Sequence, residues 1–505
     1  MNGTARRFDP PGCKLLLAAA LLLAASEAAA QEKRDEFYWL GELNKASTVM
    51  VVEQGIVPKP LGKTIADAVA QVIADAAKPG ARRSGDYLQV EPLIIAIGGP
   101  DVTRLHSGRS RQDIGSTRMR LFQRDQVLAT FAALSSARST LLDFAAKHPD
   151  AIVPAYTVGV QAQPISFGHY ILAYTQALER DGARLAQAFA TVNKSPLGSA
   201  ALGTSSFPVN RMRLAELLGF DGLIENSLDA NQLSPIDTGV ELVGVASSIA
   251  LTVGAFVSDI EAQYRMTTPW LTLEEGNLTG TSSIMPQKRN PVALNDVRIR
   301  ASDTLGTAAT YLFKAHNVPH GVPDYKGNDP IQALARAADM LDKLTSVVKE
   351  LKFNDQRALE EVNADYATTT ELADVLQRDA DVPFRVGHHF ASDLVTYGRS
   401  NGLRPTQIPF SAAEDIYAKA AAHFGIKETK LPLSERDFRR SLTPENMVRS
   451  SLGLGGPQPA EVQRMLAAQR KQLAADQAWI AERQARLSAA SDMLSKAFAQ
   501  LREGR

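Results

Sequence analysis

The residues best equipped for chemistry stand together in one short stretch, residues 279–291. It reads Thr-Gly-Thr-Ser-Ser-Ile-Met-Pro-Gln-Lys-Arg-Asn-Pro, and its small residues and prolines exclude a helix interior. The predicted loop carries hydroxyl, amide and ammonium groups at Ser282, Ser283, Gln287, Lys288 and Asn290. Such groups can bind a carboxylate and remove a proton from the carbon beside it. A solvated surface loop is the alternative interpretation.

The order of residues in this loop resembles a family signature. Gly-x-Ser-Ser-Ile-Met-Pro-x-Lys-x-Asn-Pro is similar to the signature of the fumarase/aspartase superfamily, which includes argininosuccinate lyase, fumarase and 3-carboxymuconate cycloisomerase. Three further segments resemble argininosuccinate lyases in the same order along the chain: residues 106–113, 153–169 and 367–389. The resemblance covers roughly residues 35–490.

The resemblance implies an anti elimination on a small dicarboxylate substrate. A base removes the proton beside a carboxylate, and the leaving nitrogen or oxygen then departs, usually releasing fumarate. By the resemblance Ser282 is the base, while Lys288 and Asn290 bind the carboxylate whose charge grows in the transition state. Substrate contacts are implied for the other matched side chains: Arg109, Ser110, Arg111, Gln112, Thr157, Ser283, Gln287 and Tyr325. For the two arginines, a structural ion-pair network is the alternative.

The chain departs from the argininosuccinate lyase pattern around the leaving group. Val158 stands where those lyases carry a histidine, and valine cannot carry a proton. Gln112 stands where those lyases have an asparagine. Those lyases also have a tyrosine that is followed, five and eight residues later, by a glutamine and a lysine. Tyr325 matches the tyrosine, but Pro330 and Ala333 stand at the two later positions. Three explanations are open: another group supplies the acid, the substrate differs and its leaving group needs less help, or catalysis has been lost. The imidazoles available as acids are His106, His169, His316 and His320.

We therefore predict an exported carbon–nitrogen lyase that cleaves an N-substituted aspartate or succinate-type acid to fumarate and an amine. The alternatives are a cycloisomerase acting on a carboxylated muconate and a non-catalytic periplasmic scaffold or binding protein. No metal and no cofactor are expected, since the adjacent His388 and His389 do not face one ion together on a helix. The resemblance also implies a homotetramer in which each active site draws on three subunits.

The elements that must position these residues are predicted to be helices almost throughout. Leu, Ala, Gln, Arg, Glu and Asp dominate, and long runs of alternating β-branched residues are missing. Long helices are predicted over residues 121–147, 165–194, 236–264, 292–316 and 330–352. The predicted class is all-α, with three helical domains and a long central helix bundle. The predicted ranges are a signal peptide over 1–30, an N-terminal domain over 31–120, the central bundle over 121–352 and a C-terminal domain over 353–505.

A seven-residue repeat marks the C-terminal stretch. A leucine or isoleucine recurs at Leu466, Leu473, Ile480, Leu487, Leu494 and Leu501. The alternating positions are mixed, with Gln469, Asp476 and Arg483 among them, whereas a coiled-coil seam needs apolar residues there too. The pattern predicts one long helix docked on the body of the protein, with a coiled-coil partner as the alternative.

The first thirty residues have the composition of an export signal. Arg6, Arg7 and Lys14 precede an apolar run over residues 15–25, and small residues end near Ala30. The run is too short for a bilayer span, which needs about 20 apolar residues. We expect cleavage near Ala30 and a periplasmic or secreted protein with no membrane segment after processing. Removal of the signal would take the only cysteine, three basic and two acidic side chains, leaving a net charge of −1 that points to no nucleic acid.

Overall fold

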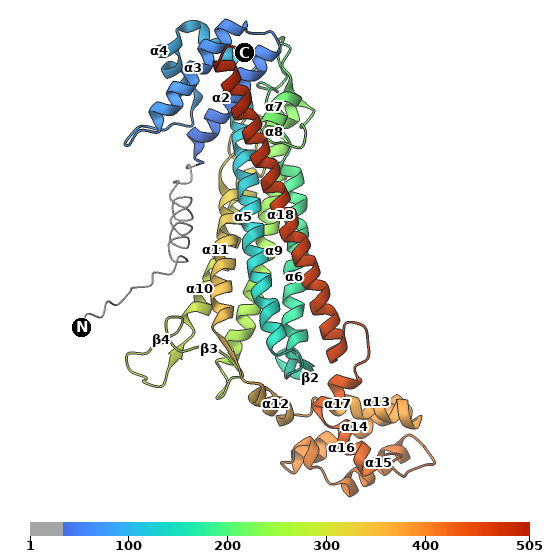
Figure 1. The fold of residues 1–505 in the computed structure, drawn as a ribbon. Helices are drawn as coiled ribbons and strands as arrows, with labels where there is room; N and C mark the ends of the chain where they lie inside the picture. Colours follow the sequence, from blue (N-terminus) through green and yellow to red (C-terminus); the bar gives the residue numbers. More distant parts are fainter. Residues whose placement is uncertain (1–33) are drawn as a thin grey trace, which may run out of the picture.

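Residues 34–505 are described by a computed structural model, which is built almost entirely from helices (Figure 1). A long bundle runs through the middle of the molecule, with a smaller group of helices at each end. The predicted all-α class with three helical regions is confirmed. The predicted signal peptide, residues 1–30, lies outside the described residues, and the predicted domain boundaries stay predictions.

Five long helices form the central bundle, and each falls where a long helix was predicted. They are α5 (Arg111–Lys147), α6 (Phe167–Val192), α9 (Ser234–Gln263), α10 (Val292–Ala315) and α11 (Asp329–Lys349). Helix α5 begins ten residues earlier than predicted because Ser110 and Asp113 form a reciprocal capping box that fixes its first turn. Its 37 residues span about 55 Å, which sets the length of the bundle.

Helix α9 is the apolar centre of this bundle. Within residues 34–505 it is the one helix long and apolar enough to cross a membrane by composition. Half of its most apolar 18-residue segment is buried, and the helix packs against α6, α10 and α11. A helix that is apolar on most sides and packed in this way is a core helix.

The N-terminal group of helices caps one end of the bundle, which we call the α2–α4 end. It contains α2 (Glu36–Glu53), α3 (Lys59–Ala76), α4 (Tyr87–Gly98) and the 3₁₀ helix η1 (Pro100–His106), joined by α7 (Arg211–Leu217) and α8 (Ser227–Gln232). Asp35 and Asp86 cap α2 and α4 by accepting backbone hydrogen bonds in the first turn. The apolar core of this group includes Leu40, Leu43 and Ile65, all fully buried.

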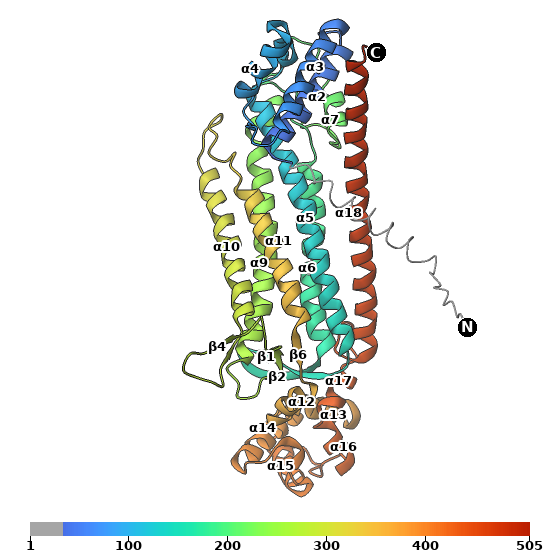
Figure 2. The same ribbon diagram turned by 60° about the vertical axis from the view of Figure 1, so that its left-hand side comes forward.

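Three short antiparallel pairs lie at the opposite end of the bundle, which we call the hairpin end (Figure 2). They are β1 (Ile152–Thr157) with β2 (Val160–Ser166), β3 (Leu271–Leu273) with β6 (Leu351–Phe353), and β4 (Gly280–Thr281) with β5 (Arg289–Asn290). None of these strands was predicted, because each run is too short or too rich in proline to show a clear period of two.

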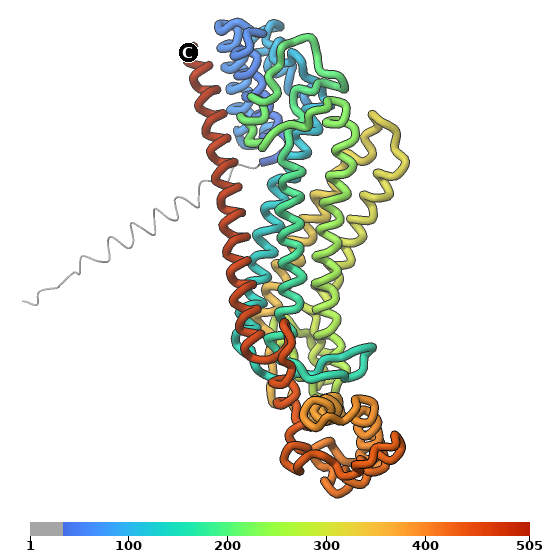
Figure 3. The backbone as a smooth tube through the Cα atoms, turned by 90° about the vertical axis from the view of Figure 1, so that its right-hand side faces the viewer, coloured from blue at the N-terminus to red at the C-terminus, as the bar shows by residue number. Residues whose placement is uncertain are grey.

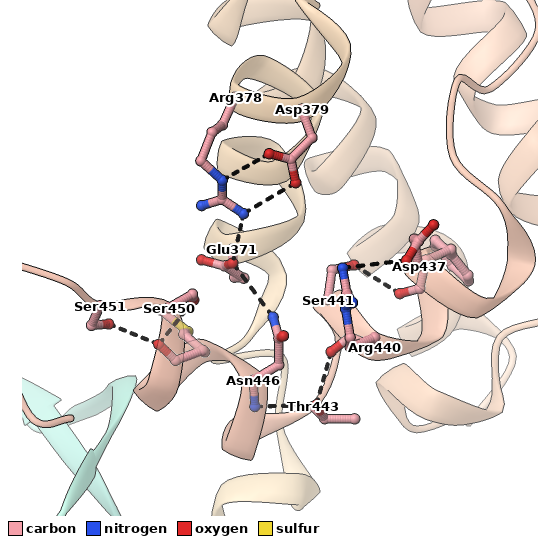
Figure 4. A network of polar contacts seen from close by, with 12 residues as sticks. Glu371, Arg378, Asp379, Asp437, Arg440, Ser441, Thr443, Asn446, Ser450 and Ser451 are labelled. Carbon is pink, nitrogen blue, oxygen red and sulfur yellow. Dashed lines mark hydrogen bonds and ion pairs between the residues drawn. The ribbon is translucent and has the colours of Figure 1, made fainter. Parts of the chain in front are cut away.

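The C-terminal domain lies beyond the hairpin end and has a core of its own. It contains α12 (Asp355–Ala364), α13 (Thr369–Ala380), α14 (Phe384–Ser400), η2 (Pro405–Gln407), α15 (Phe410–His423), α16 (Glu435–Ser441) and α17 (Pro444–Ser450). Figure 4 shows buried Glu371 between Asn446 and Arg378, which donate to its Oε1 atom at 3.5 and 3.4 Å. Thr368 donates to the carbonyl of Leu442 at 3.0 Å. The family-like segment at 367–374 therefore ties helices of this domain together.

The last helix, α18 (Pro459–Arg502), returns along the full length of the bundle to the α2–α4 end (Figure 3). The prediction of one long docked helix is confirmed: its apolar stripe enters two cores, one in the bundle and one among α2–α4. The mixed positions of the stripe make specific polar contacts with the body. Gln469 donates to the carbonyl of Leu172 at 3.1 Å, and Asp476 pairs with buried Arg138 at 2.5 Å. Polar contacts of this kind suit docking on one site better than a coiled-coil seam.

We predict that the buried ion pairs of Arg138 hold α18 in place. Arg138 is fully buried and bridges Asp476 of α18 and Glu179 of α6, at 2.5 and 2.8 Å. Arg138→Met should lower stability by about 3 kcal/mol, because two carboxylates lose their partner. The control is Arg470→Gln, which removes an exposed α18–α5 pair to Asp143 and should cost less than about 1 kcal/mol. Thermal unfolding measures both, and equal shifts would contradict the prediction.

Candidate active site

The predicted catalytic loop is a small hairpin that projects from the hairpin end (Figure 2). Strand β4 pairs with β5 through Gly280 with Asn290 and Thr281 with Arg289. Ser282 and Lys288 directly follow and precede the Thr281–Arg289 pair, so the hairpin holds their backbones opposite each other. The Arg289 guanidinium fastens the base of the loop by donating to a Glu275 carboxylate at 2.8 Å and to the Pro286 carbonyl at 2.9 Å.

The hydroxyl of Ser282 faces backbone donors of its own loop. The amides of Met285 and Ile284 donate to its Oγ atom at 3.2 and 3.4 Å. Donors aimed at an oxygen favour its negatively charged form, which is the form a serine base requires. The neighbouring predicted side chains, Ser283, Gln287, Lys288 and Asn290, make no side-chain hydrogen bond or ion pair within residues 34–505, so they are free to meet a ligand or another subunit.

Thr157 and Val158 lie at the tip of the β1–β2 hairpin, also at the hairpin end. Thr157 pairs with Val160, and the two residues between them, Val158 and Gly159, have φ angles of 52° and 76°. Positive φ at both central positions is the turn that suits a two-residue hairpin, but valine is a poor residue for it. Val158 is nevertheless fully exposed. The position of the missing histidine is therefore a strained apolar tip that touches nothing else in its own described chain.

The second group of predicted residues lies at the other end of the bundle, at the start of α5. Ser110 is the N-cap of α5 and accepts from the amide of Gln112 at 3.2 Å. Buried Asp113 accepts from the amides of Ser110 at 2.8 Å and Gly198 at 2.9 Å, which fastens the 198–200 turn to this segment. Desolvation raises the pKa of Asp113 to about 6, opposed by these amide donors and by Arg109. This supporting role of Asp113 was not predicted from the sequence.

Arg109 lies inside the α2–α4 core. Its side chain is buried, donates to Asn44 Oδ1 at 2.9 Å and lies over the ring of Tyr87 at 5.2 Å. Burial lowers the pKa of its guanidinium. In the single chain Arg109 has a structural contact with a neutral amide, and its predicted place among the substrate-binding side chains stays a prediction.

A cavity of about 310 Å³ lies beside the start of α5 and the α10–α11 loop, residues 316–328. Polar side chains on its wall include Glu36, Arg111, Gln112, Arg118, Lys326 and Asn328. Lys326 donates to Gln112 Oε1 at 2.9 Å, so the loop and the helix meet through two side chains that face the cavity. Gln112 and Arg111 were predicted from the sequence. Lys326 was missed, although its place in a turn-rich loop directly after Tyr325 was a usable signal.

Tyr325 is not among the residues that line this cavity. Its side chain is buried and its hydroxyl donates to the carbonyl of Gln232 at 2.9 Å. In the single chain it therefore supports the loop, and its predicted contact with substrate stays a prediction. The Lys326 Nζ atom lies over the Tyr325 ring, 5.9 Å from its centroid.

Of the four histidines considered as acids, two make contacts within the protein and two are exposed. His106 stacks on Tyr87, and burial lowers its pKa to about 4, so it is neutral near pH 7. The Nε2 atom of His169 lies 3.1 Å from the carbonyl of Gly455, and burial lowers its pKa as well. His316 and His320 are exposed in the α10–α11 loop. Across residues 34–505 no cluster of three or more His, Cys, Asp or Glu side chains could hold a metal ion.

One chain keeps the two groups of motif residues far apart. Ser282, Lys288 and Thr157 lie at the hairpin end, whereas Arg111, Gln112 and the cavity lie at the α2–α4 end (Figure 2). Helix α5 alone separates the two ends by about 55 Å. A substrate of a few ångströms cannot touch both groups of one chain at once.

Two family models match this chain. Residues 89–306 match a family model described as lyase, and residues 366–449 match one described as argininosuccinate lyase C-terminal. Argininosuccinate lyase 2 of Agrobacterium fabrum is 32% identical over 451 residues, which cover 86% of each chain. Argininosuccinate lyase of Methanocaldococcus jannaschii is 31% identical over 440 residues, covering 85% of this chain and 87% of that protein.

Solved structures extend the comparison. EDDS lyase in complex with formate superimposes with a TM-score of 0.84 and 29% identity, covering 93% of this chain and 92% of that one. A 3-carboxy-cis,cis-muconate lactonizing enzyme from Pseudomonas putida has a TM-score of 0.63 and 19% identity, with coverage of 89% and 97%, and shares the fold alone. The chain belongs to the fumarase/aspartase superfamily, close to argininosuccinate lyase. Its enzyme class is carbon–nitrogen lyase.

We predict that the turn at Val158 is strained and that Val158→Asn relieves the strain. Asparagine tolerates the left-handed conformation better, so the hairpin should gain about 1 kcal/mol. Hydrogen exchange of the β1–β2 amides measures this gain as slower exchange. The control is Val160→Asn, at an exposed strand position of the same hairpin, where exchange should not slow. Slower exchange in both variants, or in neither, would contradict a local strain at Val158.

Proposed function

We propose that the chain catalyses anti β-elimination from an N-substituted aspartate or succinate-type acid, releasing fumarate and an amine. Ser282 removes the proton from the carbon beside one carboxylate, and Lys288 and Asn290 bind that carboxylate while its charge grows. The C–N bond then breaks, its electron pair stays on nitrogen, and the nitrogen takes up a proton as the amine leaves. The observation that carries this proposal is the β4–β5 hairpin, which presents Ser282 beside backbone donors and opposite Lys288.

The proton for the leaving nitrogen needs a different source from the family's histidine. Val158 cannot supply it, and His106 and His169 are held in structural contacts. His316 and His320 are exposed in the loop beside the cavity and are our candidates for the acid. A substrate whose amine leaves with less help is the alternative. Loss of catalysis is the weakest explanation, because the loop residues of the signature are all present.

The proposed assembly is a homotetramer in which several chains complete each site. Its first support is the separation of the motif residues along one chain. Its second support is a row of exposed apolar side chains on α9 and α10: Val240, Leu251, Ile299, Leu312 and Phe313. Exposed apolar side chains on bundle helices are typical of contacts between copies.

We also propose that the protein is exported to the periplasm or secreted, with cleavage near Ala30. The support is the charge, apolar run and small residues of the first thirty positions. N-terminal sequencing of the protein recovered outside the cytoplasm tests the proposal. A chain that retains residue 1 there would contradict it.

The base assignment predicts the effect of Ser282→Ala. A screen of N-substituted aspartates, with fumarate followed by ultraviolet absorbance, first identifies a working substrate. Ser282→Ala should then lower kcat by about 10²- to 10⁴-fold, the usual contribution of a base. Ser283→Ala, the adjacent control, should lose less than about tenfold, because it removes at most one hydrogen-bond donor. Fumarate release unaffected by Ser282→Ala would refute the base assignment.

The shared-site assembly predicts that two inactive variants rescue each other. Ser282→Ala disables the hairpin end, and Arg111→Ala disables the α2–α4 end. When the two chains are co-expressed, some sites in the mixed oligomers combine the intact hairpin of one with the intact Arg111 of the other. Activity should therefore return to a measurable fraction of wild type. Mixed oligomers, verified by two affinity tags, that stay inactive would contradict the shared site.

A further inference from the structure

A cavity of about 510 Å³ lies at the hairpin end, between the last turns of α5 and α11 and strand β6. Its apolar part includes the buried side chains of Phe144, Val348 and Leu351. The rings of His148 and Phe353 also line it, with their centroids 5.0 Å apart. The volume is in the usual range for a small-molecule site. None of the described lining residues belongs to the predicted catalytic or substrate-binding groups.

The charged side chains that line this cavity are mainly cations. Lys147 ends α5, Lys349 ends α11 and Lys352 is the exposed residue of β6. Lys147 and Lys349 make no ion pair or side-chain hydrogen bond within residues 34–505. Asp143 is the one carboxylate among the described lining residues, and it pairs with Arg470 of α18 at 3.0 Å. The charges of Lys147 and Lys349 are therefore not balanced within the described chain.

The two unpaired lysines have a structural alternative. Each lies in the last turn of its helix, where an ammonium group is favoured by the negative end of the helix dipole. Each helix end would gain this small contribution wherever its lysine pointed. The alternative does not explain why both lysines line one cavity together with Lys352 and an apolar surface. Like charges around one space repel one another, and an anion that enters the space removes the repulsion.

We propose that this cavity is an effector site for a small organic anion that carries at least two negative charges on an apolar body. The phosphate or carboxylate groups of the anion pair with the three lysines, and its apolar body lies against Phe144 and Phe353. Lysine suits such a ligand because its ammonium group is a compact point charge, whereas the planar guanidinium of arginine favours a bidentate fit. The shared chemistry of phosphate and carboxylate ligands is their multiple negative charge.

Lys352 connects this cavity to the β4–β5 hairpin. It forms an ion pair with Glu274, which directly follows β3 and precedes Glu275. Glu275 in turn accepts a hydrogen bond from the Arg289 guanidinium of β5 at 2.8 Å. An anion in the cavity competes with Glu274 for the Lys352 ammonium group, so Lys352 has two alternative partners. A change of partner therefore alters the support at the base of the hairpin that carries Ser282.

Isothermal titration calorimetry with phenyl phosphate and with phthalate tests the binding. Both probes are dianions on an aromatic ring, and the one that binds more tightly identifies the anionic group that the site prefers. We expect a Kd of about 1 mM or lower for at least one of them. The double variant Lys147→Gln/Lys349→Gln should raise this Kd by about tenfold or more, since two charged contacts are lost. Benzyl alcohol, the neutral control, should bind at least about tenfold more weakly than the better dianion.

The matched control is Lys343→Gln on the same helix α11, which removes a lysine already paired with Asp296 at 3.4 Å. It should change the Kd less than about twofold, and Lys147→Arg/Lys349→Arg should retain binding because the charges remain. A Kd above about 1 mM for both dianions overturns the proposed site. An unchanged Kd in the double glutamine variant places the binding elsewhere and also overturns it. An equal loss in Lys343→Gln shows an effect of net charge alone and has the same consequence.

Hydrogen exchange tests the connection to the hairpin. When the better dianion is bound, the amides of residues 280–290 should exchange faster, because Glu274 loses its partner and the base of the hairpin opens more often. In Lys352→Gln, Glu274 has no such partner with or without the anion, so the anion should no longer change the exchange. Unchanged exchange in wild type, or the same change in Lys352→Gln, overturns the effector role. Neither measurement depends on fumarate release, so failure of the proposed elimination is distinguishable from failure of this site.

Discussion

The length of helix α5 is the constraint on which the rest of the structure depends. Its 37 residues hold Ser110 and Arg111 at one end of the bundle and the β1–β2 hairpin at the other, about 55 Å away. A helix this long is stabilised by packing along its whole length, against α6, α11 and α18. The same rigidity that fixes each motif residue also prevents one chain from bringing them together. The proposed catalysis therefore depends on the proposed assembly.

Each end of the bundle contributes a different kind of chemistry. The hairpin end presents short loops with free hydroxyl, amide and ammonium groups, and the backbone of the loop supports the Ser282 oxygen. The α2–α4 end presents cations on a rigid helix start, backed by buried Asp113 and by the apolar core. A site built from both can bind acid groups at two points and deprotonate between them, which explains why the proposed substrate carries several carboxylates.

The sequence predicted the helices well and the directions of side chains poorly. Long helices have a period of 3.6 residues that survives in the pattern, so α6, α9, α10 and α11 were found within a few residues. Arg109 and Tyr325 matched a family pattern by order, but whether a side chain faces a core or a cavity depends on tertiary packing. Lys326 was not predicted for the same reason. A lysine in a polar loop is common, and only the structure shows that it lines a cavity and forms no ion pair within residues 34–505.

The most direct test of the shared site is an experimental structure of the assembled protein with fumarate bound. The account predicts that one fumarate carboxylate contacts both Lys288 and Asn290 of one chain, with the Ser282 oxygen next to the carbon beside that carboxylate. It also predicts that Arg111 and Lys326 of a second chain line the adjoining space where the amine would leave. Fumarate bound within a single chain, or a Ser282 oxygen many ångströms from it, would contradict the account.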